Sequence, residues 1–227
     1  MKFYILDQLL LHPNRISAIL SALLATFFIG LVLLIHQLYH IPIPDLTRDP
    51  VAVVNAPVYT GFFSQVGIFF WAAAAAISFF TAIVLHHKSE VSHLKKFFGV
   101  SGLLFLVLGL DDIFLFHEVV FPHLGIPELM VLFVYVAFML VYGIAFFQTM
   151  SQTNYALFIA TLVLLAFSII VDFTNPTNSD IYIWEDGSKL AGIICWFFYI
   201  FQNAISTIYN QISQQGVKIT NTPKKNL

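Results

Sequence analysis

The sequence predicts an all-α integral membrane protein, a bundle of about six transmembrane helices with both termini in the cytoplasm. Three observations lead to this prediction. Apolar residues make up 59% of the chain and charged residues 10%, whereas a soluble domain has about 45–50% and about 25%. The apolar residues form continuous runs long enough to cross a bilayer, without the alternation typical of barrel strands. The lysines and arginines gather on one side of these runs.

Hydropathy predicts spans at about 16–40, 62–86, 97–121, 128–148, 155–173 and 187–209. The first run is longer than the core of a signal peptide and no small-residue cleavage site follows it, so we expect an uncleaved first span. Residues 1–15 are expected to form a short interfacial segment. Residues 210–227 are polar, and we expect a disordered tail there.

The loops between the spans differ in composition. The loop 41–61 contains four prolines and predicts an extended, turn-rich segment rather than a helix. The loop 86–96 is basic, and the loop 174–186 is acidic. In a six-span topology only Arg48 and Lys189 among the basic residues fall on the side opposite the termini. The positive-inside rule therefore places both termini in the cytoplasm, with the chain in the plasma membrane.

The third span, 97–121, carries Asp111, Asp112, His117 and Glu118. A charge near the bilayer centre costs about 2.5–3.5 kcal/mol even on a mild insertion scale, so each acid needs a partner. On a regular helix Asp111 and Glu118 lie within about 20° of each other, with Asp112 and His117 rotated about 100° and 120° to either side. We therefore expect Asp111 and Glu118 to meet one ligand together with either Asp112 or His117.

Small residues predict where helices approach closely. Gly102 and Gly109 lie nearly opposite Asp111 on the third span, where they allow a second helix to come close. The alanine run 72–76 predicts a similar contact on the second span. A helix with acids on one face and glycines on the other is expected to be enclosed on both sides. We take the third span as the central helix.

The predicted orientation brings polar residues from several spans to one level. The third span runs outward, so Asp111 is expected near the midplane, with His117 and Glu118 closer to the outer surface. The other polar side chains assigned to this outer half are His36, His40, Asp172, Glu185, Asp186 and Lys189. The sequence thus predicts an acidic pocket that contains histidine and opens to the outer face.

Carboxylates and histidines at this density predict a divalent metal site. Zinc prefers four ligands that include histidine nitrogen, whereas a set made mostly of oxygen suits magnesium or manganese. The predicted ligands are Asp111 and Glu118 with His117 or Asp172. The alternative is structural: one aspartate is protonated and another pairs with Lys189.

Three functions are consistent with such a pocket. The first is a metal-dependent hydrolase acting on a lipid or amphiphile, with Asp112 as general base and Lys189 as electrostatic stabiliser. The second is a cation- or proton-coupled transporter or solute-binding subunit, in which Lys189 changes partners as the acids titrate. The third is a structural or assembly subunit. The structural alternative for Lys189 is that it serves only as the surface partner of Glu185, which lies four residues before it.

Several classes are excluded by what the sequence lacks. It contains no glycine-rich phosphate loop, no G-x-S-x-G elbow and no H-E-x-x-H motif. The formal charge of −2 and the absence of a basic stripe argue against binding to nucleic acid. The single cysteine, Cys195, cannot form an internal disulfide. The expected partners are therefore the lipid bilayer and a lipid or small-molecule substrate.

Overall fold

The computed structural model describes residues 13–86, 92–153, 155–174 and 182–220, and within these ranges all regular structure is helical. The chain divides into two compact units, Met1–Thr60 and Gly61–Leu227. Among the described residues six helices are long and apolar enough to cross a membrane, which confirms the predicted number of spans.

The first unit consists of one long helix and two short ones. Helix α2 (Pro13–Tyr39) is followed by α3 (Ile43–Thr47) and α4 (Pro50–Val53). The prediction that the proline-rich loop contains no helix is therefore wrong. Proline is tolerated in a first helical turn, where its missing N–H has no intrahelical partner, and Pro50 opens α4 in this way. The Asp49 carboxylate caps that helix by accepting the backbone N–H of Val51 at 2.8 Å.

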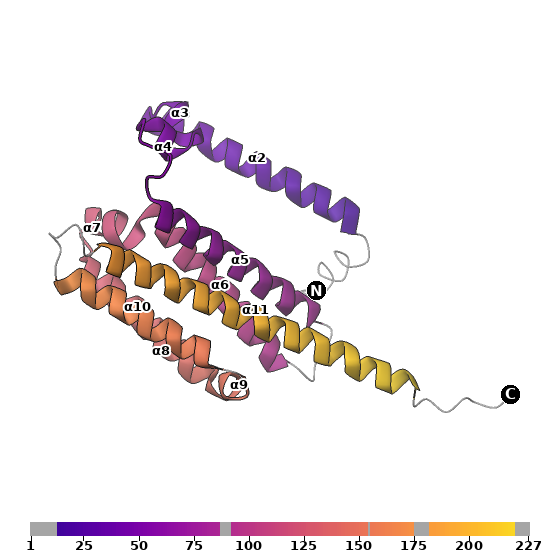
Figure 1. Ribbon diagram of the computed structural model, residues 1–227. Coiled ribbons are helices and arrows are strands. Elements are labelled where there is room, and N and C mark those ends of the chain that lie inside the picture. Colours follow the sequence, from indigo (N-terminus) through magenta and orange to yellow (C-terminus); the bar gives the residue numbers. More distant parts are fainter. Residues whose placement is uncertain (1–12, 87–91, 154, 175–181, 221–227) are drawn as a thin grey trace. The chain divides into compact units, whose positions relative to one another are not determined.

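The second unit is a helical bundle (Figure 1). Helix α5 packs along both α6 and α11, and α10 packs along α11. After α6 the chain forms one π-helical turn, η2, and a short helix before α8 begins. The elements are α5 (Phe62–Val84), α6 (Ser92–Phe114), η2 (Phe116–Val120), α7 (Phe121–His123), α8 (Glu128–Ala145), α9 (Phe147–Ser151), α10 (Ala156–Thr174) and α11 (Tyr182–Thr220).

At both ends of the chain, the helices extend into segments that the sequence predicts to lie outside the spans. Where a disordered tail is expected from residue 210, α11 continues as a helix to Thr220. Residues 221–227, and most of the predicted interfacial segment, lie outside the described residues. Helix α2 begins at Pro13, within that segment.

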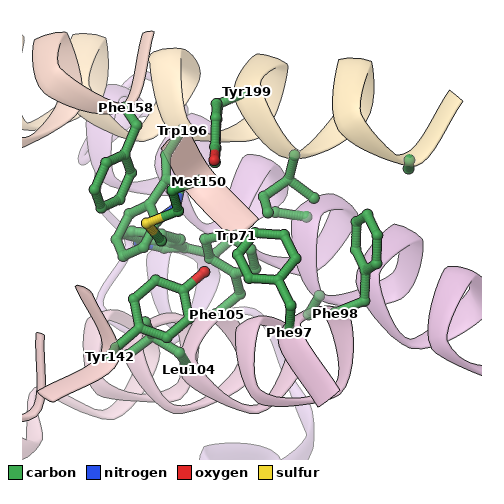
Figure 2. Packing of buried hydrophobic residues seen from close by; sticks show 14 of the residues in the cluster. Trp71, Phe97, Phe98, Leu104, Phe105, Tyr142, Met150, Phe158, Trp196 and Tyr199 are labelled. Atoms are coloured by element: carbon green, nitrogen blue, oxygen red, sulfur yellow. The ribbon is translucent and has the colours of Figure 1, made fainter. Parts of the chain in front are cut away.

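Aromatic side chains form the centre of the second unit (Figure 2). Trp71 from α5, Phe105 from α6 and Trp196 from α11 meet there, and the Phe105 and Trp196 ring centroids are 4.8 Å apart in an edge-to-face arrangement. All three are almost fully buried. This cluster joins three helices, so it fixes how the polar residues near the ends of those helices meet.

The predicted close approach at the glycines of the third span is confirmed. A Cβ added to Gly102 would lie 2.8 Å from the Phe79 ring, and one added to Gly109 would lie 3.0 Å from the Trp71 Cβ. Both neighbours belong to α5. Helix α6 therefore packs against α5 through its small residues, as the sequence suggests.

The prediction of one continuous third helix over 97–121 is wrong. Helix α6 ends at Phe114, and Leu115 adopts the left-handed conformation with φ 52° and ψ 46°. For a residue with a Cβ this conformation costs roughly 1–2 kcal/mol. The π-helical turn η2 follows directly. Side chains beyond Leu115 therefore do not follow the ideal helical wheel that places those before it.

Candidate functional site

Asp111 accepts three hydrogen bonds near the end of α6. Its Oδ1 accepts the Tyr135 hydroxyl at 2.9 Å and the backbone N–H of His117 at 3.0 Å. Its Oδ2 accepts the Nδ1–H of His117 at 2.5 Å. The residue is only 3% exposed, so its carboxylate is buried with partners on both oxygens. We call Asp111, His117 and Tyr135 the Asp111 network.

The break at Leu115 explains why His117 reaches Asp111. On an unbroken helix the two side chains point about 120° apart. The left-handed residue turns the chain, so the His117 N–H bonds to the Asp111 side chain instead of a helical carbonyl. The predicted pairing of Asp111 with Glu118 on one face is a consequence of the ideal wheel. In the structure His117 is the partner of Asp111.

Glu118 lies at the outer end of this network. Its side chain is 47% exposed, and its Oε1 lies 3.4 Å from the His117 Nε2. The imidazole therefore sits between a buried carboxylate and a half-exposed one. These contacts form a continuous line from Glu118 through His117 and Asp111 to Tyr135.

The charge state of His117 follows from these contacts. Burial of the ring opposes protonation, but the hydrogen bond and the negative charge of Asp111, helped by Glu118, outweigh burial, so the pKa of His117 is raised above its ordinary value. An unperturbed histidine has a pKa of about 6.5. The folded structure therefore favours the imidazolium form of His117 more than water does.

Asp112 belongs to a second network. Its Oδ1 accepts a hydrogen bond from the Lys189 ammonium at 2.7 Å, and its Oδ2 accepts the Trp71 indole N–H at 2.7 Å. The Asp112 side chain is 8% exposed and that of Lys189 is 37% exposed. The basic group thus pairs with the central helix instead of acting only as a surface partner of Glu185. We call Asp112, Lys189 and Trp71 the Asp112 network.

A small cavity of about 30 Å³ adjoins this network. Since one water needs roughly 10–15 Å³ of such volume, the cavity has room for about two water molecules and not for a larger solute. It is open to the surface on one side. Its lining residues come from α5, α6 and α11 and are Phe63, Ser64, Gly67, Asp112, Asp186, Lys189, Leu190 and Ile193.

The predicted metal ligands do not gather around one point. In the part of the chain that the structure describes, no group of three or more histidine, cysteine, aspartate or glutamate side chains is placed to hold a metal ion. Asp172 is exposed at the end of α10 and interacts electrostatically with Glu185. The metal site therefore stays a prediction.

His36 and His40 belong to the first unit. His36 donates its Nδ1–H to the Ile41 carbonyl at 2.7 Å, and His40 has a positive φ of 55°. The pair therefore forms part of the turn that ends α2, in a unit separate from the one that contains the two networks.

Two residues of these networks are not among the site residues predicted from the sequence. Trp71 and Tyr135 are aromatic residues of apolar helices, and such residues most often serve packing. Their indole N–H and phenolic hydroxyl need partners when buried. That requirement is the only signal in the sequence, and it applies equally to every other buried tryptophan and tyrosine of the chain.

No curated protein and no solved structure matches this chain. A family defined by a domain of unknown function, DUF8692, matches residues 18–203. The match includes every residue of the Asp111 and Asp112 networks. The chain therefore belongs to the DUF8692 family, and its six apolar helices indicate a multi-pass membrane protein.

Proposed function

We propose that this protein couples proton movement to transport across the membrane, with Glu118, His117 and Asp111 as the proton-carrying groups. The observation that carries this proposal is the line of acid–base contacts from the half-exposed Glu118 to the buried Asp111. Ionisable residues at membrane depth are typical of proton relays and ion pathways. Histidine suits the central place, because its charge changes near neutral pH.

The contacts give each group a definite task. Glu118 exchanges protons with water, because half of its side chain is exposed. His117 passes a proton between its two ring nitrogens, one facing Glu118 and the other bonded to Asp111. Asp111 is the buried acceptor, and the Tyr135 hydroxyl stabilises its charged form.

The Asp112 network has a different task in this proposal. Asp112 and Lys189 form one ion pair, which neutralises the second buried carboxylate of the central helix. With Asp112 paired, a proton that arrives at Asp111 changes the charge of one carboxylate only. The pair also connects α6 to α11, so a change of charge at Asp111 acts on a helix in another part of the bundle.

The proposal is tested by proton flux into liposomes that contain the purified protein and an internal pH dye. A pH gradient and a potassium diffusion potential are imposed in turn, with and without sodium. We expect His117→Gln and Asp111→Asn to reduce flux by at least about a hundredfold, the lower end of the effect of a lost proton-transfer group. His123→Gln is the matched control, because His123 is exposed on α7. Flux equal in wild type and both variants contradicts the proposal.

We further propose that the acidic loop 174–186 and the loop 41–61 face the outside, with both termini in the cytoplasm. The distribution of lysine and arginine supports this orientation. In a chain with Cys195→Ala, a cysteine at Thr47 should react with an impermeant thiol reagent on intact cells. A cysteine at Ser92 should react only after the membrane is opened. The reverse pattern inverts the orientation.

The second candidate function is a metal-dependent hydrolase acting on a lipid or amphiphile. One observation favours it: Asp111 fixes the Nδ1 of His117 and leaves Nε2 beside Glu118, the arrangement in which a carboxylate orients a metal-binding histidine. Of the predicted ligands, His117 and Glu118 would then hold zinc, magnesium or manganese, while Asp111 orients His117. Asp112 would serve as general base, with Lys189 as the electrostatic stabiliser.

The two candidates are separated by metal analysis of protein purified without chelator. A stoichiometric metal that Glu118→Gln removes supports the hydrolase. Metal-free protein that conducts protons supports the transporter. Metal-free protein without proton flux leaves the third possibility, in which the two networks hold an assembly subunit together.

A further inference from the structure

We propose that Trp71 is a positioning residue, which holds Asp112 in its ion pair with Lys189 and so keeps the two adjacent aspartates in separate networks. The inference concerns the same site and takes its purpose from the proposed function. Its geometry and its test are independent of proton flux.

The first observation is how the Asp112 carboxylate is held. The Trp71 indole N–H donates to Oδ2 at 2.7 Å, and the Lys189 ammonium donates to Oδ1 at 2.7 Å. The two donors come from different helices, α5 and α11, and approach different oxygens. A carboxylate fixed at both oxygens cannot rotate to offer either oxygen to another partner without losing a charge-assisted hydrogen bond.

The second observation is how Trp71 itself is held. Its residue is 3% exposed, and its ring packs against Phe105 at 5.8 Å and Trp196 at 5.7 Å between centroids. Gly109 lies three residues before Asp112 and thus on the same side of α6. A Cβ at Gly109 would lie 3.0 Å from the Trp71 Cβ, so glycine is what allows Trp71 to stand this close to Asp112.

The third observation is the contrast with Trp196. This residue is fully buried in the same cluster, yet its indole N–H has no partner within the described residues. Packing alone therefore does not supply an indole of this core with an acceptor. Trp71 has a hydrogen-bond acceptor because it lies beside Asp112. Substitution of Trp196 is therefore a matched control for loss of the Trp71 N–H.

Removal of the Trp71 N–H should loosen the ion pair. The Asp112 carboxylate is then held by Lys189 alone and is free to rotate. The Lys189 side chain is already 37% exposed, so a looser pair makes its amine more available to reagents. The reactivity of this one amine thus reports on the position of Asp112.

The experiment measures the rate at which Lys189 is acylated in detergent, at the level of the individual peptide, by mass spectrometry. Asp112→Asn sets the upper limit, because it removes the ion pair. We expect Trp71→Phe to raise the Lys189 rate towards that limit, by about tenfold, the scale of one lost charge-assisted hydrogen bond. Trp196→Phe removes an equal group from the same cluster and should leave the rate unchanged.

A second pair of variants separates positioning from packing. Gly109→Ala should raise the Lys189 rate because its Cβ displaces Trp71, whereas Gly143→Ala, with no atom within 4 Å of the added Cβ, should not. Equal rates in Trp71→Phe and wild type would overturn the inference, as would equal acceleration by Trp71→Phe and Trp196→Phe. Failure of the flux experiment alone leaves this result standing, so the two proposals fail separately.

Discussion

Asp111 and Asp112 are neighbours in the chain, yet their networks are assembled in opposite ways. Asp111 is bound mainly by His117, six residues later, through its side chain and its backbone N–H. Asp112 is bound by Trp71, 41 residues earlier, and by Lys189 from the last helix. The first network depends on a local break in the backbone, and the second depends on the packing of three helices.

This difference teaches that two acids of one motif need not serve one centre. The main partner of Asp111 belongs to the same segment, so substitutions in this network should disturb the packing between helices less. A network between helices cannot lose a partner without disturbing their packing. The expected consequences of substitution therefore separate: variants of the Asp112 network should act on stability, and variants of the Asp111 network on pH dependence and flux.

The largest effect is expected for Lys189→Met. It leaves the buried Asp112 carboxylate unpaired, which for a buried pair costs about 3–5 kcal/mol. The partial exposure of Lys189 favours the low end, about 3 kcal/mol. Adding Asp112→Asn should restore much of the loss, whereas adding Asp111→Asn should not. Thermal unfolding in detergent gives both coupling energies. Equal rescue by the two aspartate variants would contradict the separation of the two networks.

Asp111→Asn should have the next largest effect, a loss of about 2 kcal/mol, because hydrogen bonds to a charged group are weakened together. The same variant should abolish proton flux, which Lys189→Met/Asp112→Asn should retain in part. Chemical denaturation and liposome flux measure the two quantities on the same preparations. Retained flux in Asp111→Asn would remove Asp111 from the proton pathway.

His117→Gln should remove a pH dependence of stability. Because the pKa of His117 is raised in the folded chain, its stabilisation is fully present below the ordinary value of about 6.5 and is lost as the pH rises through the raised value. Unfolding temperatures of wild type should therefore fall relative to His117→Gln as the pH increases. Parallel curves for the two proteins would contradict this sign.

The smallest effect is expected for Tyr135→Phe, which removes one hydrogen bond to Asp111 and should cost about 1 kcal/mol. Its matched control is Tyr142→Phe on the same helix. The Tyr142 hydroxyl lies 2.7 Å from that of Ser101, away from both networks. Both variants should lose similar stability, but only Tyr135→Phe should change the flux. Identical flux in both variants would show that Tyr135 contributes to packing and not to the proton pathway.

Much of the fold could be predicted because the bilayer dictates it. Only helices long enough to cross the hydrocarbon satisfy their backbone there, so hydropathy finds them directly. The close approach at Gly102 and Gly109 followed from residue size alone. The short helices α3 and α4 were missed because proline was read as a helix breaker, although in a first turn it is compatible with a helix.

The site was harder to predict for two physical reasons. Position 115 is a leucine and not a glycine or proline, so the local sequence contains no signal that α6 ends there. Beyond the break, the Asp111 carboxylate accepts the backbone N–H of His117, a contact that a regular helix would not form. The roles of Trp71 and Tyr135 depend on which helices become neighbours. Lys189 was a candidate because Arg48 is the only other basic residue predicted on that side, but its pairing with Asp112 depends on how α11 packs.

The length of α11 gives the Asp112 network a mechanical reach. The helix has 39 residues, and at about 1.5 Å per residue it is a rod of about 58 Å, nearly twice the thickness of the hydrocarbon core. Lys189 stands near one end, and Thr220 lies about 46 Å further along. A tilt of α11 by about 5° about the Lys189–Asp112 ion pair would therefore displace Thr220 by about 4 Å. A rigid helix of this length would convert an ångström-scale adjustment at the ion pair into a larger displacement at its far end.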